Sequence, residues 1–558
     1  MTTPTPVETD SPLVTVADLH VGYVRRRRSV PAVAGIDLTI RSGEIVALVG
    51  ESGSGKTTVA NTLIGLLPDN ATIGGGSVVV DGVEVVGAKE RTLRSLRGSV
   101  VGLVPQDPMV GLNPTRRIGA QVAESVRLRG VSGPQVDAEV LELLDQAGID
   151  DPALRARQYP HELSGGLRQR VLIAIALAGK PRLIIADEPT SALDVTVQST
   201  ILDHLERLVR DSGTSLLIIT HDLAVAADRS DRVVVLQHGR IVEQGRPADI
   251  LVRPAHEYTR RLIAAAPGLA NGGRIVPHFD LAPSEVATPD PIIRLESVSK
   301  AYARPGGGDR FLALDDVTIE VARGRTHALV GESGSGKTTA LRLALGLEQV
   351  TSGRVILDGT DITGLGWKQT RPLRRTIQLV HQNPYASLDP RFTIGQSIVE
   401  PLVSFKIGDR ASRAARAAEL LDQVSLPSSY RDRLPSELSG GQRQRVAIAR
   451  ALALSPELIL LDEPVSALDV SVQEQILQLL TELQERLGLS YLFISHDLAV
   501  VAQVSHTVSV LNRGTVVESG SVAQVFGSPQ SQYTHQLIDA IPGQRAEAAA
   551  HVEEVAHV

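Results

Sequence analysis

An identical eleven-residue segment, LVGESGSGKTT, occurs twice in this chain of 558 residues, at positions 48–58 and 329–339. Three further segments recur in the same order: ELSGG from Glu162 and Glu437, DEPxSALDV from Asp187 and Asp462, and HDLAV from His221 and His496. These three recur 275 residues apart, whereas the first recurs 281 residues apart. Solenoid repeats have periods of roughly 20–50 residues. The repeat therefore predicts two similar domains of about 250 residues each.

Composition locates the boundaries between these domains. The segment 267–291 is rich in Pro, Gly and Ala and lacks periodicity, which is typical of a linker. The tail is expected to be mobile, with a short helix as the alternative. The predicted division is a flexible N-terminus at 1–12, a first domain at 13–266, a linker at 267–291, a second domain at 292–542 and a flexible tail at 543–558.

The overall composition excludes several classes of protein. Hydrophobic residues make up 42% and charged residues 21%, which is typical of a soluble globular protein. No apolar run approaches the ~18–20 residues of a membrane helix, and no signal peptide is visible. The chain lacks cysteine, which excludes disulfides, thiolate zinc sites and cysteine-ligated iron–sulfur clusters within it. The net charge of −7 argues against a nucleic-acid-binding protein.

The repeated segment GESGSGKT fits the phosphate-loop pattern G-x-x-x-x-G-K-[ST]. Its glycines let backbone N–H groups surround phosphate oxygens, and the following helix adds a partial positive charge. Lys56 and Lys337 are predicted to reach the β- and γ-phosphates, and the Thr57 and Thr338 hydroxyls to bind Mg²⁺. A glycine-rich turn with a solvated lysine is the alternative, and the second copy disfavours it. The predicted ATP-binding residues here are Gly50, Ser52, Gly53, Gly55, Lys56, Thr57, Thr58, Gly331, Ser333, Gly334, Gly336, Lys337, Thr338 and Thr339.

A pair of acidic residues ends a near-continuous apolar run in each half, RLIIADEP and ELILLDEP. Such a run predicts a strand buried on both faces of a parallel sheet, and ligands bind at the carboxyl ends of such strands. Asp187 and Asp462 are therefore predicted to hold Mg²⁺, directly or through water. Glu188 and Glu463 follow and are predicted to accept the proton of the water that attacks the γ-phosphate. An acidic helix cap is disfavoured because proline follows both pairs.

The remaining motifs identify the family. LSGG followed by RQR lies between the phosphate loop and the acidic strand in both halves, His221 and His496 each follow an apolar run, and Gln106 and Gln382 lie in VPQDP and VHQNP. Over about residues 13–542 the chain resembles two fused ATP-binding cassettes of the ABC transporter superfamily. The resemblance implies an α/β fold of two tandem P-loop NTPase domains, each with a parallel-sheet core and a helical signature subdomain, which pair head to tail.

That pairing implies composite ATP sites, in which the phosphate loop of one half faces the LSGG signature of the other. Lys56, Asp187, Glu188 and His221 would work with the signature of the second half, and Lys337, Asp462, Glu463 and His496 with that of the first. The implied signature residues are Ser164, Gly165, Gly166, Ser439, Gly440, Gly441 and Gln442. The first signature reads LSGGL, with Leu167 in the place of Gln442, which predicts a weaker site at Lys337.

The resemblance implies further roles for residues near each loop. The histidines would orient the γ-phosphate and the attacking water, and Gln106 and Gln382 would contact Mg²⁺ and sense the membrane partner. The SALD segments would link the two sites. Tyr23 and Tyr302 would stack on adenine, although a strand tyrosine packed on the core is the alternative.

The flanking segments narrow the family. QDPMVGLNP, QNPYASLDPR and the two endings HEYTRRLIAAAP and SQYTHQLIDAIP resemble the ATPase subunits of bacterial dipeptide, oligopeptide and nickel importers. The resemblance implies a peripheral protein on the cytoplasmic face of the membrane, with ATP and Mg²⁺ as cofactors. Its implied partners are two permease subunits and an extracytoplasmic binding protein. Peptide is the expected solute, while nickel, glutathione-like peptides, haem and sugars stay open. The cysteine cluster that some relatives carry is absent.

Other classes of cassette protein fit less well. A twin-cassette ATPase that acts on ribosomes would carry a long charged helical segment between its cassettes, whereas this linker is short and nearly neutral. A cassette ATPase of DNA repair or chromosome structure would show zinc cysteines or long coiled coils. An exporter would usually carry fused membrane helices.

Overall fold

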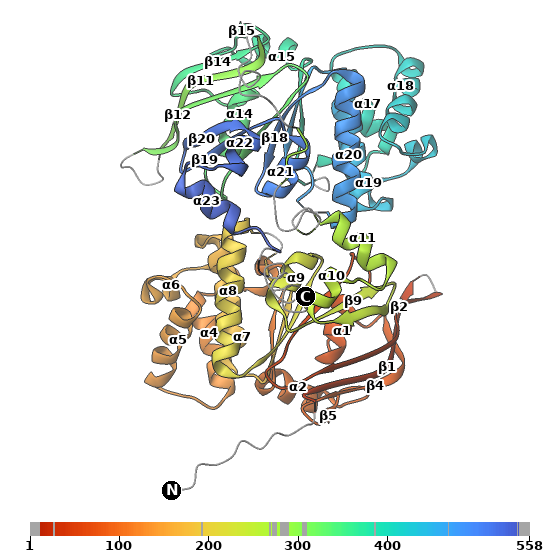
Figure 1. Cartoon of the computed structure of the whole chain (residues 1–558), viewed down its shortest axis with the longest axis vertical. Coiled ribbons are helices and arrows are strands. Elements are labelled where there is room, and N and C mark those ends of the chain that lie inside the picture. Colours follow the sequence, from red (N-terminus) through yellow and green to blue (C-terminus); the bar gives the residue numbers. More distant parts are fainter. Residues whose placement is uncertain are drawn as a thin grey trace, which may run out of the picture. The chain divides into compact units, whose positions relative to one another are not determined.

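The computed structural model describes most of the chain, and Figure 1 shows it coloured along the sequence. The described residues are 12–25, 28–190, 193–266, 269, 276–279, 290–303, 310–383, 387–466, 468–543 and 545. Most of the predicted N-terminus, linker and tail therefore lies outside the described residues. The chain divides into a first unit (1–193, 197–273 and 542–558) and a second unit (194–196 and 274–541).

A six-stranded sheet forms the centre of the first unit, in the order β10-β9-β3-β8-β7-β6. Its strands are β3 (Ile45–Val49), β6 (Val101–Val104), β7 (Leu183–Asp187), β8 (Ser215–Thr220), β9 (Arg232–Gln237) and β10 (Arg240–Gly245). Every pair is parallel except that of β9 with β10. All residues of β3, β7 and β8 are buried, as the continuous apolar runs in the sequence predict for central parallel strands.

A second sheet of the first unit is antiparallel, in the order β2-β1-β4-β5. Its strands are β1 (Val14–Arg25), β2 (Arg28–Ile40), β4 (Ala71–Val80) and β5 (Val83–Glu84). The helices α1 (Lys56–Leu63) and α2 (Glu90–Ser99) share one apolar core with this sheet and with the central one, and this core includes Leu19, Leu48 and Leu63. The helix that follows the phosphate loop is thus fixed between two sheets.

A helical subdomain follows β6 in the sequence. It comprises α3 (Pro108–Gly111), α4 (Ile118–Leu128), α5 (Pro134–Gln146), α6 (Pro152–Arg157), the 3₁₀ turn η1 (Pro160–Glu162) and α7 (Gly165–Ala178). Its core packs α4, α5 and α7 together through side chains such as Val122, Leu144 and Ile173. The unit is completed by α8 (Val195–Ser212), α9 (Leu223–Arg229), α10 (Pro247–Val252) and α11 (Glu257–Ala265).

The second unit repeats this plan. Its central sheet has the order β16-β17-β18-β13-β19-β20 and its antiparallel sheet the order β12-β11-β14-β15. The strands are β11 (Pro291–Tyr302), β12 (Phe311–Ala322), β13 (Thr326–Val330), β14 (Ser352–Leu357), β15 (Thr360–Asp361), β16 (Ile377–Val380), β17 (Leu458–Asp462), β18 (Ser490–Ser495), β19 (Thr507–Asn512) and β20 (Thr515–Ser521).

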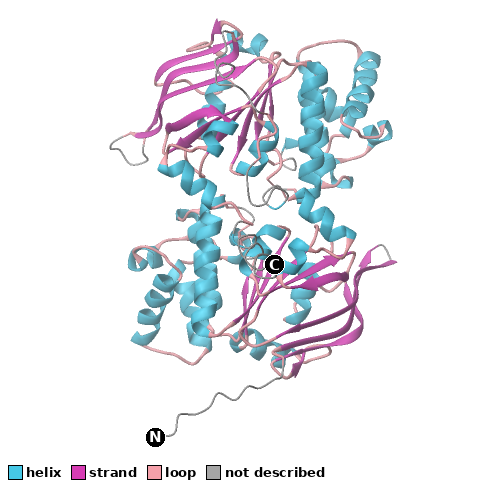
Figure 2. Cartoon of the chain, viewed as in Figure 1, coloured by secondary structure: helices cyan, strands magenta, loops and turns pink. Residues whose placement is uncertain are grey.

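The helices of the second unit follow the order of those in the first, except that no described helix corresponds to α3 and the 3₁₀ turn η2 takes the place of α6. Figure 2 colours both units by secondary structure. The helices of the second unit are α14 (Lys337–Ala344), α15 (Trp367–Leu373), α17 (Ile394–Ser404), α18 (Arg410–Gln423), η2 (Ser428–Asp432), η3 (Pro435–Glu437), α19 (Gly440–Leu452), α20 (Val470–Leu487), α21 (Leu498–Val504), α22 (Val522–Gly527) and α23 (Gln532–Asp539).

The predicted fold class is confirmed in both halves. Each unit has a mainly parallel central sheet, an added antiparallel sheet and a helical subdomain that includes the signature. Among the described residues, no helix has both the length and the apolar character that a membrane crossing requires.

Candidate nucleotide site of each unit

The strand order of the central sheet brings the predicted site residues to one edge. The phosphate loop follows β3, and His221 follows β8. Asp187 ends β7 with Glu188 directly after it, and Gln106 lies shortly after β6. These strands are parallel neighbours in the order β3-β8-β7-β6, so their carboxyl ends lie side by side at one edge of the sheet. The second unit has the same arrangement through β13, β18, β17 and β16.

The phosphate loop requires glycine at two points because the backbone passes close to its neighbours. A Cβ atom on Gly50 would lie 2.2 Å from the carbonyl oxygen of Leu236. Gly55 has a φ of +108°, and a Cβ there would lie 2.5 Å from the carbonyl oxygen of Ala32. The equivalent Gly331 and Gly336 are similarly restricted.

Both loop lysines are buried and point back into their own loops. The Lys56 ammonium donates to the carbonyl oxygens of Gly50 (2.6 Å) and Glu51 (3.0 Å). Lys337 makes the same pair of bonds to Gly331 (2.6 Å) and Glu332 (2.8 Å). Burial lowers the pKa of Lys337, against the opposing effect of nearby acids that include Glu463 and Asp462. The ammonium groups are thus held at the loops, within reach of the position expected for bound phosphate oxygens.

Each candidate base is held by two neighbours. Glu188 accepts a hydrogen bond from Gln106 Nε2 (2.8 Å), and its other oxygen lies 3.3 Å from Nδ1 of His221. Burial alone would raise the pKa of Glu188, but the hydrogen bond and charge of His221 hold it below its ordinary value. The carboxylate is therefore kept ionised, which a proton acceptor requires.

The second unit repeats this contact set. Gln382 Nε2 donates to Glu463 (2.8 Å), and Nδ1 of His496 lies 3.3 Å from the same carboxylate. Burial acts to lower the pKa of His496, but the hydrogen bond and charge of Glu463 outweigh it, so this pKa is raised. The pair stabilises charge on both partners.

Backbone conformation aims each glutamate at its histidine. Glu188 and Glu463 have left-handed φ values of 43° and 44°. Their N–H groups still donate to β8 and β18, at Ile219 (2.8 Å) and Ile494 (3.0 Å). Left-handed backbone at a residue other than glycine costs about 1–3 kcal/mol and is concentrated at functional sites. The chain thus turns sharply directly after the strand, which places the two acids on different sides.

Of the residues predicted to bind Mg²⁺, Thr57 and Asp187 lie in contact and suit that ion. Thr57 Oγ1 donates to Asp187 Oδ1 at 3.4 Å, and burial raises the pKa of Asp187. Burial also raises the pKa of Asp462. A buried carboxylate beside a hydroxyl suits Mg²⁺, which takes few protein ligands and the remainder from phosphate and water. In the described part of the chain no group of three or more His, Asp or Glu side chains could hold a metal by itself.

The two signatures cap their helices differently. Ser164 Oγ accepts from the Leu167 N–H (3.3 Å) at the start of α7. Ser439 Oγ accepts likewise from the Gln442 N–H (3.3 Å), and Gln442 Oε1 in return accepts from the Ser439 N–H (3.0 Å). This reciprocal capping box is incomplete in the first unit, because Leu167 has no side-chain atom that can accept from the Ser164 N–H. The leucine side chain packs against the apolar core.

Close packing against a neighbouring helix requires glycine at one position of each signature. A Cβ on Gly166 would lie 2.7 Å from Cγ1 of Val197, and one on Gly441 would lie 2.3 Å from Cγ1 of Val472. Both valines belong to the helix that follows the SALD segment. The signature helix and that helix therefore approach as closely as side-chain packing allows.

The predicted adenine-stacking tyrosines lie beside the loop helices. The Tyr23 hydroxyl is 3.1 Å from Oγ1 of Thr58, and the Tyr302 hydroxyl donates to Glu348. Sequence reasoning did not predict Tyr258 and Tyr533 as site residues, yet their hydroxyls accept from the phosphate-loop N–H groups of Glu51 (2.9 Å) and Glu332 (3.0 Å). Their signal was present, since HEYT and SQYT place the two tyrosines 275 residues apart.

Strand order, loop geometry and the acid–histidine pairs define a P-loop ATPase of the cassette class. The family description "ABC transporter" matches residues 33–191 and 314–466. The description "Oligopeptide/dipeptide transporter, C-terminal region" matches residues 242–290 and 517–556. The chain belongs to the ABC transporter family, as an ATPase that hydrolyses ATP to drive transport.

Three curated relatives are similar over nearly their whole length. The "Oligopeptide transport ATP-binding protein OppD" of Mycobacterium tuberculosis is 42% identical, over 95% of this chain and 98% of the relative. The "Peptidoglycan transport ATP-binding protein YejF" of Agrobacterium fabrum is 44% identical, over 95% and 96%. The "Glutathione import ATP-binding protein GsiA" of Salmonella typhimurium is 41% identical, over 95% and 89%. The predicted importer family is thereby confirmed.

Replacing both candidate bases should separate ATP binding from hydrolysis. In Glu188→Gln with Glu463→Gln, the amide keeps the shape of the side chain but cannot accept the proton, so hydrolysis should fall by about 10²–10⁴-fold. Nucleotide retained after gel filtration and phosphate release would be measured together. Rapid hydrolysis by the double variant would remove these residues from the role of base.

Proposed function

We propose that this chain is the ATPase subunit of an importer of short peptides, attached to the cytoplasmic face of the membrane by its permease partners. The observation that carries the proposal is the pair of oligopeptide/dipeptide C-terminal regions, one in each half. Relatives named for oligopeptide and glutathione transport support a peptide solute. Nickel, haem and sugar are the competing solutes.

The proposed cofactors are ATP and Mg²⁺ in both halves. The Lys56 and Lys337 ammonium groups would move from the loop carbonyls to the phosphates, and Thr57 with Asp187, or Thr338 with Asp462, would hold the ion. When bound, Mg²⁺ supplies charge neutralisation at the phosphates. Gln106 and Gln382 already contact the candidate bases, so they can link occupancy of the ion site to the adjoining helical subdomain.

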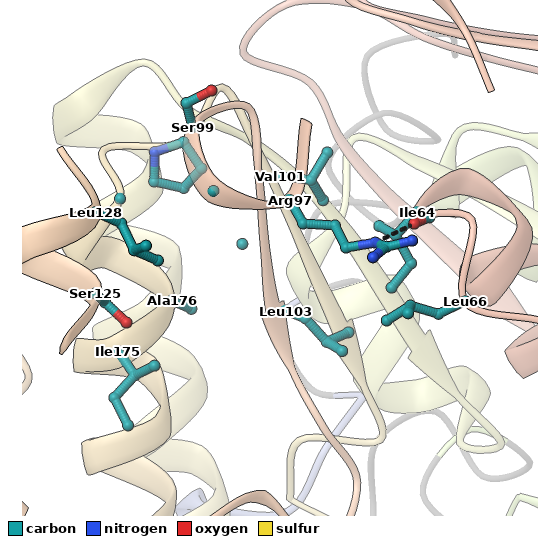
Figure 3. Close-up of a pocket in the computed structure, with 14 residues that line it drawn as sticks. Ile64, Leu66, Arg97, Ser99, Val101, Leu103, Ser125, Leu128, Ile175 and Ala176 are labelled. Atoms are coloured by element: carbon teal, nitrogen blue, oxygen red, sulfur yellow. Dashed lines mark hydrogen bonds between the residues drawn. The ribbon is translucent and has the colours of Figure 1, made fainter. Parts of the chain in front are cut away.

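The proposed site for a permease partner is a pocket of about 170 Å³ in the first unit, shown in Figure 3. It is lined by the ends of α2 and α4, by β6 and by α7, and it is mainly apolar. Arg97 donates to the carbonyl oxygens of Ile64 (2.8 Å) and Gly65 (2.8 Å), and its charge is balanced by Glu90 at 3.0 Å. Leu128 at the rim is 72% exposed. An apolar face of a permease segment would cover these side chains, directly beside the strand that leads to Gln106.

Peptide uptake by the assembled transporter tests the proposed function. Vesicles that contain this chain, its permeases and the binding protein should accumulate a labelled short peptide when supplied with MgATP, and should not accumulate nickel, haem or sugar. Leu128→Asp should reduce uptake and co-purification with the permeases because it places a charge in the docking surface, while ATP binding is kept. Failure to take up peptides, together with ATP-driven uptake of another solute, would contradict the peptide assignment.

We further propose that the ATP sites are composite and unequal. The family resemblance pairs Lys56 with the second signature and Lys337 with the first. The missing glutamine at Leu167 leaves the Ser164 N–H without its side-chain cap, which supports weaker binding at the Lys337 site by about fivefold, equivalent to ~1 kcal/mol for one net hydrogen bond.

Site-selective labelling tests this composite arrangement. Ser439→Arg places a bulky cation at the second signature and should empty the Lys56 site, while the matched Ser164→Arg should empty the Lys337 site. A photoreactive ATP analogue followed by peptide mapping would report the occupancy of each loop. Loss of labelling in the loop of the same half as the substitution would show that each half binds ATP with its own signature.

A further inference from the structure

One peptide group in each phosphate loop is hydrogen-bonded at both ends. The carbonyl oxygen of Gly50 and the N–H of Glu51 belong to the same planar peptide. The carbonyl accepts from the Lys56 ammonium at 2.6 Å, and the N–H donates to the Tyr258 hydroxyl at 2.9 Å. The orientation of this peptide therefore depends on two side chains from opposite directions.

The second unit repeats the arrangement independently. The carbonyl oxygen of Gly331 accepts from Lys337 at 2.6 Å, and the N–H of Glu332 donates to the Tyr533 hydroxyl at 3.0 Å. Burial raises the pKa of Tyr533 to about 12, so its hydroxyl stays neutral at physiological pH. The two loops are identical in sequence, whereas the helices that carry the tyrosines differ at four of the eight aligned positions of 257–264 and 532–539.

The helix that carries Tyr258 is itself fixed to the sheet. Glu243 on β10 accepts from the N–H groups of Ala255 (2.7 Å) and His256 (3.0 Å), directly before α11. His256 Nδ1 then accepts from the Tyr258 N–H at 3.1 Å. The exposed fraction of Tyr258 is 3%, and its ring packs within a buried apolar cluster, which restricts its movement.

An equivalent anchor holds Tyr533. Glu518 on β20 accepts from the N–H groups of Gln530 (2.9 Å) and Ser531 (3.1 Å), and Ser531 Oγ accepts from the Tyr533 N–H (3.3 Å). The acid, the capping side chain and the tyrosine occur in the same order in both units. The capping residues differ, His256 in one unit and Ser531 in the other, but in both units the tyrosine hydroxyl bonds the same N–H of the phosphate loop.

We propose that Tyr258 and Tyr533 are positioning residues for ATP binding, through which the C-terminal helix of each half sets the conformation of its phosphate loop. The hydroxyl fixes the first peptide of the loop, and that peptide places the carbonyl that holds the lysine ammonium. When ATP arrives, the lysine leaves this carbonyl for the phosphates, and the tyrosine hydroxyl continues to hold the N–H end of the peptide. A preformed loop loses less conformational freedom on binding, so the hydroxyl increases affinity without touching the nucleotide.

Removing the hydroxyls tests the proposal in the full-length chain. Tyr258→Phe with Tyr533→Phe keeps the aromatic packing and removes one hydrogen bond to each loop, and should weaken ATP binding about fivefold. The KM for ATP should rise similarly, with a smaller change in kcat. Hydrogen exchange at the loop segments 48–58 and 329–339 should become faster.

Tyr491→Phe is the matched control. Its hydroxyl is also buried and donates to a backbone carbonyl, that of Leu480 at 3.0 Å, but it contacts no phosphate loop. This variant should lower Tm without changing ATP affinity or loop exchange. If the double variant behaves as the control does, with a lower Tm and ATP affinity within twofold of the native protein, the tyrosines are structural only and the proposal is wrong. If each single variant speeds hydrogen exchange and weakens ATP binding only at the loop of its own unit, the positioning role is supported.

Discussion

Each nucleotide site depends on the burial of a short central strand on both faces. β3 and β13 are completely buried between parallel neighbours, so their ends cannot shift without breaking the packing of two layers. The phosphate loop that leaves each strand passes so close to the next backbone that glycine alone fits at Gly50 and Gly331. From that fixed start, the loop can direct its N–H groups and its lysine toward a single point.

The same sheet explains why residues far apart in sequence lie together at the site. Gln106, Glu188 and His221 come from three different loops, but these loops follow parallel strands that lie side by side. The left-handed turn at the glutamate then brings its carboxylate to both partners. Strain at one residue is maintained because the buried strand before it and the hydrogen bond to β8 hold the backbone.

Much of this site could be predicted from the sequence because its motifs are local. The spacing of GESGSGKT gives the loop, and the apolar run before Asp187 gives a buried strand with its acid at the ligand edge. The contacts of Glu188 with Gln106 and His221 are harder to predict from the sequence. They depend on the strand order and on a left-handed backbone angle that a glutamate does not indicate. The sequence shows that leucine replaces glutamine at position 167. The hydrogen bond lost by this replacement is identified only by comparing the two signatures in the structure.

The tyrosine contacts show what sequence reasoning missed. Tyr258 lies about 200 residues from the loop that it contacts, and helix periodicity places it only on an apolar face. Its repetition at Tyr533 was visible, but repetition alone does not distinguish packing from positioning. The evidence for positioning is that the peptide bonded to each tyrosine is also bonded to the loop lysine, a contact that depends on the folded backbone.

We expect both phosphate loops to bind ATP, and to support its hydrolysis, through their lysines. Phosphate release from MgATP by Lys56→Ala with Lys337→Ala measures this most directly, with Lys368→Ala, an exposed lysine on α15, as the control. We expect a loss on the order of 100-fold or more in the double variant and native activity in the control. Native turnover by the double variant would contradict it.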